Sequence, residues 1–146
     1  MLPLHSVYAD GLRWLPTLNR KAEFPGAMAR ILLAEDDDHL RLFLSRGLQR
    51  AGHIVNAVDD GTAALRLAGT ENFDLLLADV VMPGLDGIEL ARRLGTLQPG
   101  IRIMFITGFA AVVMRDEGLS PNRPRVLAKP FHLRHLIDEI EALLLE

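Results

Sequence analysis

Apolar residues follow two alternating patterns from residue 30 to the end of the chain. Short, nearly continuous apolar runs predict five strands, over residues 31–34, 53–58, 73–78, 102–106 and 126–128. Apolar residues spaced three and four apart predict a helix after each strand, over residues 40–48, 62–68, 88–94, 110–115 and 133–144. Strands that alternate with helices form a parallel sheet with helices on both faces, so we predict an α/β fold.

The first 27 residues do not continue this alternation. They contain the only tryptophan and the only tyrosine of the chain, together with three prolines that prevent a long helix. They lack the continuous apolar centre of a secretory signal. Leucines around Pro16 could form one amphipathic, partner-binding turn, but we favour a disordered tail or a mis-assigned start with Met28 as the natural first residue. We therefore divide the chain into an extension, 1–27, and a domain, 28–146.

Length and composition narrow the class of protein. The 146 residues are 49% hydrophobic and 24% charged, which fits one globular domain without a separate output domain. No run of about 18 apolar residues occurs, so we expect no membrane insertion. The chain has no cysteine, which excludes disulfides and thiolate metal sites and is consistent with the cytoplasm.

The charge of the chain is concentrated unevenly. The chain has 16 basic and 19 acidic groups, of which three basic and two acidic groups lie in the first 27 residues. The remaining residues therefore have 13 basic and 17 acidic groups, a net charge of −4. An acidic domain does not favour the phosphate backbone of nucleic acid, so we expect no nucleic-acid partner. Lys129 is the single lysine of that domain.

Polar side chains lie where the predicted strands end. They are Glu35, Asp36, Asp79, Thr107 and Lys129. Because the carboxyl ends of parallel strands meet at one edge of a sheet, we expect these side chains to share a cleft. Three carboxylates in one cleft repel each other unless a cation lies among them, and Mg²⁺ prefers carboxylate oxygens and water as ligands. The sequence therefore predicts a Mg²⁺ site.

The same cleft has the groups that a phosphoryl acceptor needs. Lys129 and the cation would offset the phosphoryl charge, and Thr107 would donate a hydrogen bond. Asp79 is the candidate nucleophile, and it would form an aspartyl phosphate. We therefore predict a phosphoryl-accepting site.

Four motifs, in this order, resemble those of response-regulator receiver domains over residues 30–146. They are the segments Ile31–Asp37, Asp79–Gly87, Ile106–Gly108 and Lys129–Phe131. The resemblance implies a flavodoxin-like (CheY-like), doubly wound five-stranded parallel sheet of strand order 2-1-3-4-5 with five helices.

The resemblance also implies a role for each site residue. Asp79 would be the phosphoacceptor, and Thr107 and Lys129 would contact the phosphoryl oxygens. Asp36 would bind Mg²⁺ more directly than Glu35, which would act through water. The metal ligands would come from Glu35, Asp36, Asp79 and the main-chain carbonyl of Val81. The bond between Lys129 and Pro130 would be cis.

The segments around Glu35, Asp79 and Thr107 further resemble the CpdR-like subfamily of single-domain regulators. This implies a switch in a two-component phosphorelay, with a histidine kinase or histidine phosphotransferase as phosphoryl donor. In that subfamily the unphosphorylated form primes the ClpXP protease for certain substrates in cell-cycle control, and phosphorylation ends the priming. We expect a monomer or weak dimer, with self-phosphorylation and self-dephosphorylation as its sole chemistry.

Some positions depart from the usual receiver pattern. Val126 stands where many receivers have an aromatic residue that turns inward on activation. Val81 and Phe109 are apolar where other receivers often have groups that orient water, which predicts slow self-hydrolysis. Core packing explains about half of the apolar run 109–114. We expect Phe109, Val113 and Val126 to form a switch-dependent partner surface.

Two other functions remain open on the sequence. One is a phosphorelay carrier that passes the phosphoryl group between histidine proteins and has no regulated partner. The other is a Mg²⁺-dependent phosphohydrolase, which would have its nucleophile after the first strand and a cap over the substrate. Because the candidate nucleophile here, Asp79, follows the third strand, we prefer the signalling switch.

Overall fold

The computed structural model describes residues 28–108 and 124–146. The extension 1–27 and the predicted helix 110–115 lie outside the described residues, and so do Phe109 and Val113. Within the described ranges, no helix is both long enough and apolar enough to cross a membrane.

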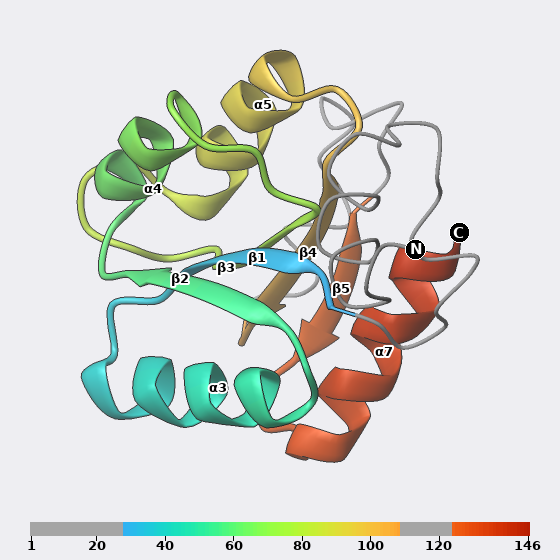
Figure 1. The fold of residues 1–146 in the computed structure, drawn as a ribbon. Helices are drawn as coiled ribbons and strands as arrows, with labels where there is room; N and C mark the ends of the chain where they lie inside the picture. Colours follow the sequence, from blue (N-terminus) through green and yellow to red (C-terminus); the bar gives the residue numbers. More distant parts are fainter. Residues whose placement is uncertain (1–27, 109–123) are drawn as a thin grey trace, which may run out of the picture.

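The described residues form a parallel sheet with the strand order β2-β1-β3-β4-β5. In chain order the elements are β1 (Arg30–Ala34), α3 (Asp38–Arg50), β2 (Ile54–Val58), α4 (Gly61–Ala68), β3 (Leu75–Asp79), α5 (Gly87–Leu97), β4 (Arg102–Thr107), β5 (Arg125–Ala128) and α7 (Leu133–Leu145). The strand order and the alternation confirm the predicted fold class. Figure 1 shows how the chain crosses between the strands.

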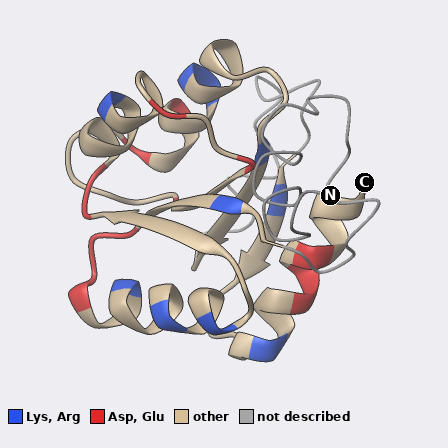
Figure 2. Cartoon of the chain, in the orientation of Figure 1, with Lys and Arg blue, Asp and Glu red and all other residues tan. Residues whose placement is uncertain are grey.

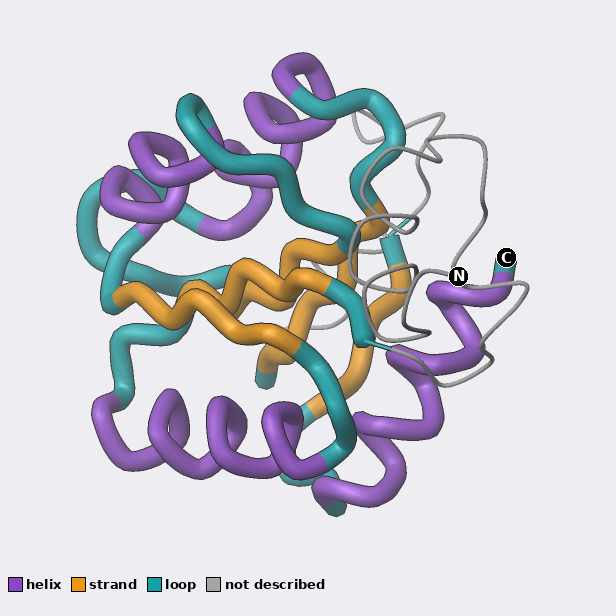
Figure 3. The backbone as a smooth tube through the Cα atoms, in the orientation of Figure 1, coloured by secondary structure: helices purple, strands orange, loops and turns teal. Residues whose placement is uncertain are grey.

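The helices cover both faces of the sheet. Helices α4 and α5 pack on one face, and α3 and α7 pack on the other (Figures 1 and 3). Alternate side chains of β1, β3 and β4 therefore enter two separate apolar clusters. Every residue of β3 is buried, as the continuous apolar run predicted, whereas β2 forms an edge of the sheet and is partly exposed.

The carboxylates before the first three described helices set where those helices begin. The side chains of Asp37, Asp60 and Asp86 each accept a hydrogen bond from a main-chain N–H of the first turn, at 3.0, 2.7 and 2.9 Å. The apolar periodicity gave the inner part of each helix, and these caps place the first residue.

The largest difference between a predicted and an observed strand boundary is at the start of the third strand. The apolar run predicts that the third strand starts at Phe73, but β3 begins at Leu75. The N–H of Phe73 donates to Oε1 of Gln98, at 2.8 Å, and therefore does not join the strand ladder. Phe73 is nevertheless buried, so its apolar side chain belongs to the core without belonging to the strand.

Candidate functional site

The carboxyl ends of the central strands bring the predicted polar residues together. Glu35 and Asp36 follow β1, Asp79 ends β3, Thr107 ends β4 and Lys129 follows β5. Acidic segments lie in the loops after β1 and β2, at the left of the view in Figure 2. One carboxylate oxygen from each of Glu35, Asp36 and Asp79 lies within 4.8 Å of the other two. The predicted convergence of these carboxylates is therefore confirmed.

Each oxygen of the Asp79 carboxylate has its own donor. The ammonium group of Lys129 donates to Oδ2 at 2.9 Å, and the N–H of Val81 donates to Oδ1 at 3.2 Å. Asp79 is only 8% exposed. The carboxylate is thus held in one orientation by two donors, and a small part of it remains exposed to solvent.

Glu35 is the most deeply buried acid of the cluster. Its side chain is fully buried, and neither carboxylate oxygen has a hydrogen-bond donor among the described residues. The nearest cation, Lys129 Nζ, is 3.6 Å from Oε1. Burial and, next, the charge of Asp79 raise the pKa of Glu35 to about 7. Glu35 therefore changes its charge near neutral pH, well above the pH at which an exposed glutamate does so.

Lys129 is held in the site by both carboxylates. Partial burial alone would lower the pKa of Lys129, but the hydrogen bond to Asp79 and the charge of Glu35 outweigh it and raise that pKa. The lysine is therefore charged when it faces the cluster. The peptide bond between Lys129 and Pro130 is cis, as expected.

Thr107 and Val81 are both close to Asp79, because Thr107 follows Ile106, the partner of Asp79 in the sheet, and the N–H of Val81 donates to Asp79. Thr107 is fully buried, and its main-chain carbonyl accepts a hydrogen bond from the N–H of Lys129 at 3.0 Å. Val81 is 56% exposed directly beside Asp79, so its apolar side chain faces solvent at the mouth of the site. Val126 is partly buried and pairs with Phe105 in the sheet. Its side chain packs against the apolar core between the sheet and helices α4 and α5.

The loop between β3 and α5 approaches the sheet closely through a glycine. A Cβ at Gly87 would lie 2.1 Å from the main-chain oxygen of Asp79, and the N–H of Gly87 donates to the Val80 carbonyl at 2.9 Å. Any side chain at this position would push the loop away from Asp79. Gly87 was not among the predicted site residues, although its place in the segment Asp79–Gly87 was a signal for it.

Arg41 is a second residue near the site that was not among the predicted site residues. Its guanidinium group donates to the main-chain carbonyl of Glu35 at 2.9 Å and to Oδ1 of Asp38 at 2.7 Å. An arginine on the first turns of a helix is usually a solvated surface residue, so the spacing alone carried no signal for this contact.

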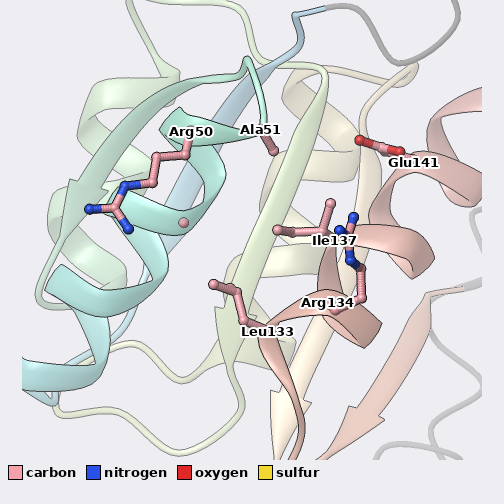
Figure 4. Close-up of a pocket in the computed structure, with 7 residues that line it drawn as sticks. Arg50, Ala51, Leu133, Arg134, Ile137 and Glu141 are labelled. Carbon is pink, nitrogen blue, oxygen red and sulfur yellow. The ribbon is translucent and has the colours of Figure 1, made fainter.

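A separate hollow lies between α3 and α7 and has a volume of about 380 Å³. Figure 4 shows Leu133 and Ile137 pointing from α7 toward α3, with Arg50 and Arg134 at its rim. None of the acidic cluster residues lines it. The hollow is therefore distinct from the site at the strand ends.

Residues 31–141 match the family model of the response regulator receiver domain. This chain belongs to that family. It is 52% identical over 118 residues to the response regulator receiver protein CpdR of Brucella abortus, an alignment that covers 81% of this chain and 98% of CpdR.

Solved receiver structures share the fold. The receiver domain of the hybrid histidine kinase CckA is 31% identical, with a TM-score of 0.67 over 80% of this chain and 99% of that one. The response regulator TrrA of Thermotoga maritima, in complex with Mg²⁺-BeF, is 26% identical, with a TM-score of 0.69 over 78% and 97%.

Family membership fixes the general function. Receiver domains are phosphoacceptors of two-component signalling rather than enzymes in the usual sense, and they exchange phosphoryl groups with histidine kinases or phosphotransferases. Phosphorylation and the binding of Mg²⁺ at an acidic pocket are typical of the family, and Glu35, Asp36 and Asp79 form an acidic cluster in this structure. The predicted receiver domain is therefore confirmed.

Proposed function

We propose that this chain is a stand-alone receiver that accepts a phosphoryl group on Asp79 with the help of Mg²⁺. The observation that carries this proposal is the geometry of one carboxylate. Lys129 Nζ lies 2.9 Å from Oδ2 of Asp79, and two further carboxylates lie within 4.8 Å. A structural ion pair would not need the extra carboxylates, whose mutual repulsion costs stability.

The residues present fit a Mg²⁺ ion. Neither oxygen of the buried Glu35 carboxylate has a hydrogen-bond donor among the described residues. Burying such a carboxylate in its charged form lowers stability unless the oxygens bind a cation. Glu35, Asp36, Asp79 and the main-chain carbonyl of Val81 would hold the ion, all through oxygen, the donor type that Mg²⁺ selects. When bound, Mg²⁺ offsets the negative charge that builds up on the phosphoryl oxygens.

The chain supplies the remaining chemistry with its own side chains. A carboxylate oxygen of Asp79 attacks the phosphorus of a phosphohistidine, the new O–P bond forms as the P–N bond breaks, and the imidazole leaves with a proton from solvent. Lys129 donates a hydrogen bond to one phosphoryl oxygen, and the Thr107 hydroxyl donates to another. Because the Val81 N–H and Lys129 already orient Asp79, little reorganisation is needed.

Phosphotransfer tests this proposal. A histidine phosphotransferase carrying labelled phosphate is mixed with wild type, with Asp79→Asn, or with wild type plus EDTA. We expect label to move to wild type with Mg²⁺ present, and to remain on the donor in the other two reactions. Equal labelling of Asp79→Asn would contradict the assignment of Asp79, and equal labelling in EDTA would contradict the Mg²⁺ site.

For the output of the switch we propose the CpdR-like role, in which the unphosphorylated chain primes ClpXP for its substrates. The 52% identity across nearly the whole of CpdR supports this choice over an unrelated single-domain receiver. We propose that Val126, together with Phe109 and Val113, contributes to the partner surface. Phosphorylation adds about two negative charges at Asp79, beside the end of β4, and would bias that surface.

Binding to purified ClpX tests the output. Wild type should bind ClpX, and binding should fall when a phosphodonor and Mg²⁺ are added, whereas Asp79→Ala should bind in both conditions. Wild type that binds equally in both conditions would contradict a phosphorylation switch. Wild type that accepts and passes on phosphate but binds in neither condition would instead identify a phosphorelay carrier.

We further propose that residues 28–146 are sufficient for the receiver function and that the extension 1–27 is dispensable. The family match begins at residue 31, beyond the extension. A chain that starts at Met28 should accept phosphate at the rate of the full chain and behave as a monomer or weak dimer. A large loss of phosphotransfer in that shorter chain would contradict the division.

A further inference from the structure

Arg41 connects helix α3 to the loop that carries the acidic pair. Its NH1 donates to the main-chain carbonyl of Glu35 at 2.9 Å, and its NH2 donates to Asp38 at 2.7 Å. The side chain of Arg41 is 22% exposed, so it lies mostly against the protein rather than in solvent. Two of the donors of its planar fork are therefore used within the segment that leads from β1 into α3.

The carbonyl that Arg41 contacts belongs to the peptide group between the two acids. On the β1 side of this peptide, the N–H of Glu35 donates to the Val58 carbonyl at 3.1 Å, which fixes Glu35 to β2. On the other side, Asp37 is fixed because its side chain caps α3. Asp36 lies between these anchors and is exposed, so the peptide before it largely determines where its carboxylate points.

The contact differs from an ordinary surface ion pair. The partner carboxylate in the ion pair, Asp38, is 83% exposed, and a pair of this kind contributes little to stability. The bond to the Glu35 carbonyl involves no opposite charge and acts on the orientation of a peptide plane. Arg41 therefore has a geometric effect on the acidic pair that is separate from its charge.

We propose that Arg41 is a positioning residue for the metal site, which holds the Glu35–Asp36 peptide so that both carboxylates face Asp79. This inference rests on the proposed Mg²⁺ site. Residues that orient metal ligands from behind typically change metal affinity by 10- to 100-fold when they are replaced, although they do not touch the metal. Arg41 has that relation to Glu35 and Asp36, and it acts through the main chain.

Calorimetric titration of the full chain with Mg²⁺ tests the proposal. Arg41→Ala should weaken Mg²⁺ binding by about 10-fold or more. Arg41→Lys keeps the charge but lacks the planar fork, so it should recover only part of the affinity. Arg46→Ala, an exposed arginine on the same helix, should bind Mg²⁺ like wild type.

A second control separates positioning from a general loss of stability. Gln98 accepts a hydrogen bond from the N–H of Phe73 and donates to the carbonyls of Ala68 and Glu71, so Gln98→Ala should unfold at a lower urea concentration than wild type. These bonds lie at the start of β3, whereas the acidic cluster lies at the strand ends. Gln98→Ala should therefore be destabilised but keep the Mg²⁺ affinity of wild type.

The outcomes are distinct. Weaker Mg²⁺ binding in Arg41→Ala and, to a smaller degree, in Arg41→Lys, with unchanged binding in Gln98→Ala, supports the positioning role. Unchanged affinity in both Arg41 variants overturns it, and so does a loss of affinity in Gln98→Ala that matches its loss of stability. If Arg41→Ala does not fold, Arg41→Lys alone decides the question. Wild type that binds no Mg²⁺ contradicts the proposed metal site itself.

Discussion

Lys129 Nζ and Asp79 Oδ2 lie 2.9 Å apart, and the same ammonium group is 3.6 Å from Glu35. One cation therefore offsets two buried carboxylates, with Asp36 nearby as a third. The acidic cluster therefore has more negative charge than Lys129 can offset. Most of the expected behaviour of the site follows from this excess of negative charge.

Removal of the lysine charge should expose that imbalance. In EDTA at pH 8, Lys129→Ala should have a free energy of unfolding about 1–3 kcal/mol below wild type, because the buried carboxylates lose their cation. Lys129→Arg keeps the positive charge, so its free energy of unfolding should fall by less than that of Lys129→Ala. Urea unfolding measures both, and a Lys129→Ala chain as stable as wild type would mean that the ion pair has no net effect.

Glu35 should make stability fall as pH rises. The pKa of Glu35 is about 7 in the folded chain and 4.5 when unfolded, so between these values the folded state binds more protons. The contribution of Glu35 to the free energy of unfolding is present in full below pH 4.5 and is lost as the pH rises to about 7. This contribution amounts to roughly 3 kcal/mol. In EDTA, Glu35→Gln should remove this dependence and be more stable than wild type at pH 8. An unchanged pH slope in that variant would contradict the burial-driven shift.

His53 should act in the opposite direction. It is 4% exposed, its Nδ1 accepts from the N–H of Ala29 at 3.2 Å, and burial lowers its pKa although Glu141 and Asp74 oppose this. The unfolded chain therefore binds the extra proton first, and stability should fall as pH drops below about 6.5.

The Glu35→Gln variant is the background in which to measure this effect, because the slope from Glu35 is then absent. Adding His53→Leu should reduce the loss of stability between pH 7.5 and pH 5.5, measured by urea unfolding, to nearly zero. The same loss in the double variant would show that another group titrates.

Val81 should slow the loss of the phosphoryl group. Its side chain is 56% exposed beside Asp79 and cannot hydrogen-bond an attacking water. Val81→Asn should therefore raise the rate of dephosphorylation several-fold, measured after rapid removal of the phosphodonor. Adding Phe109→Glu should raise it further, and a rate unchanged in both variants would disprove the idea.

The sequence was sufficient to predict the sheet and the residues at its carboxyl edge. Buried parallel strands give continuous apolar runs, and the topology then forces Asp79, Thr107 and Lys129 together. The contacts of Arg41 and Gly87 could not be predicted in this way. The contact of Arg41 depends on where its long side chain folds back, and that of Gly87 depends on how closely a loop approaches the sheet. Neither feature produces a periodic pattern in the sequence.

Acceptance of the phosphoryl group by Asp79 can be tested directly by locating the phosphorylated residue. The most direct measurement is to phosphorylate the chain with a small-molecule donor and Mg²⁺, reduce it with borohydride, and locate the product by peptide mass spectrometry, since an aspartyl phosphate is reduced to homoserine. We predict homoserine at position 79 in wild type and none when the donor or Mg²⁺ is left out. Homoserine at position 36 in place of position 79, or no homoserine at any position, would contradict the assignment of Asp79 as the phosphoacceptor.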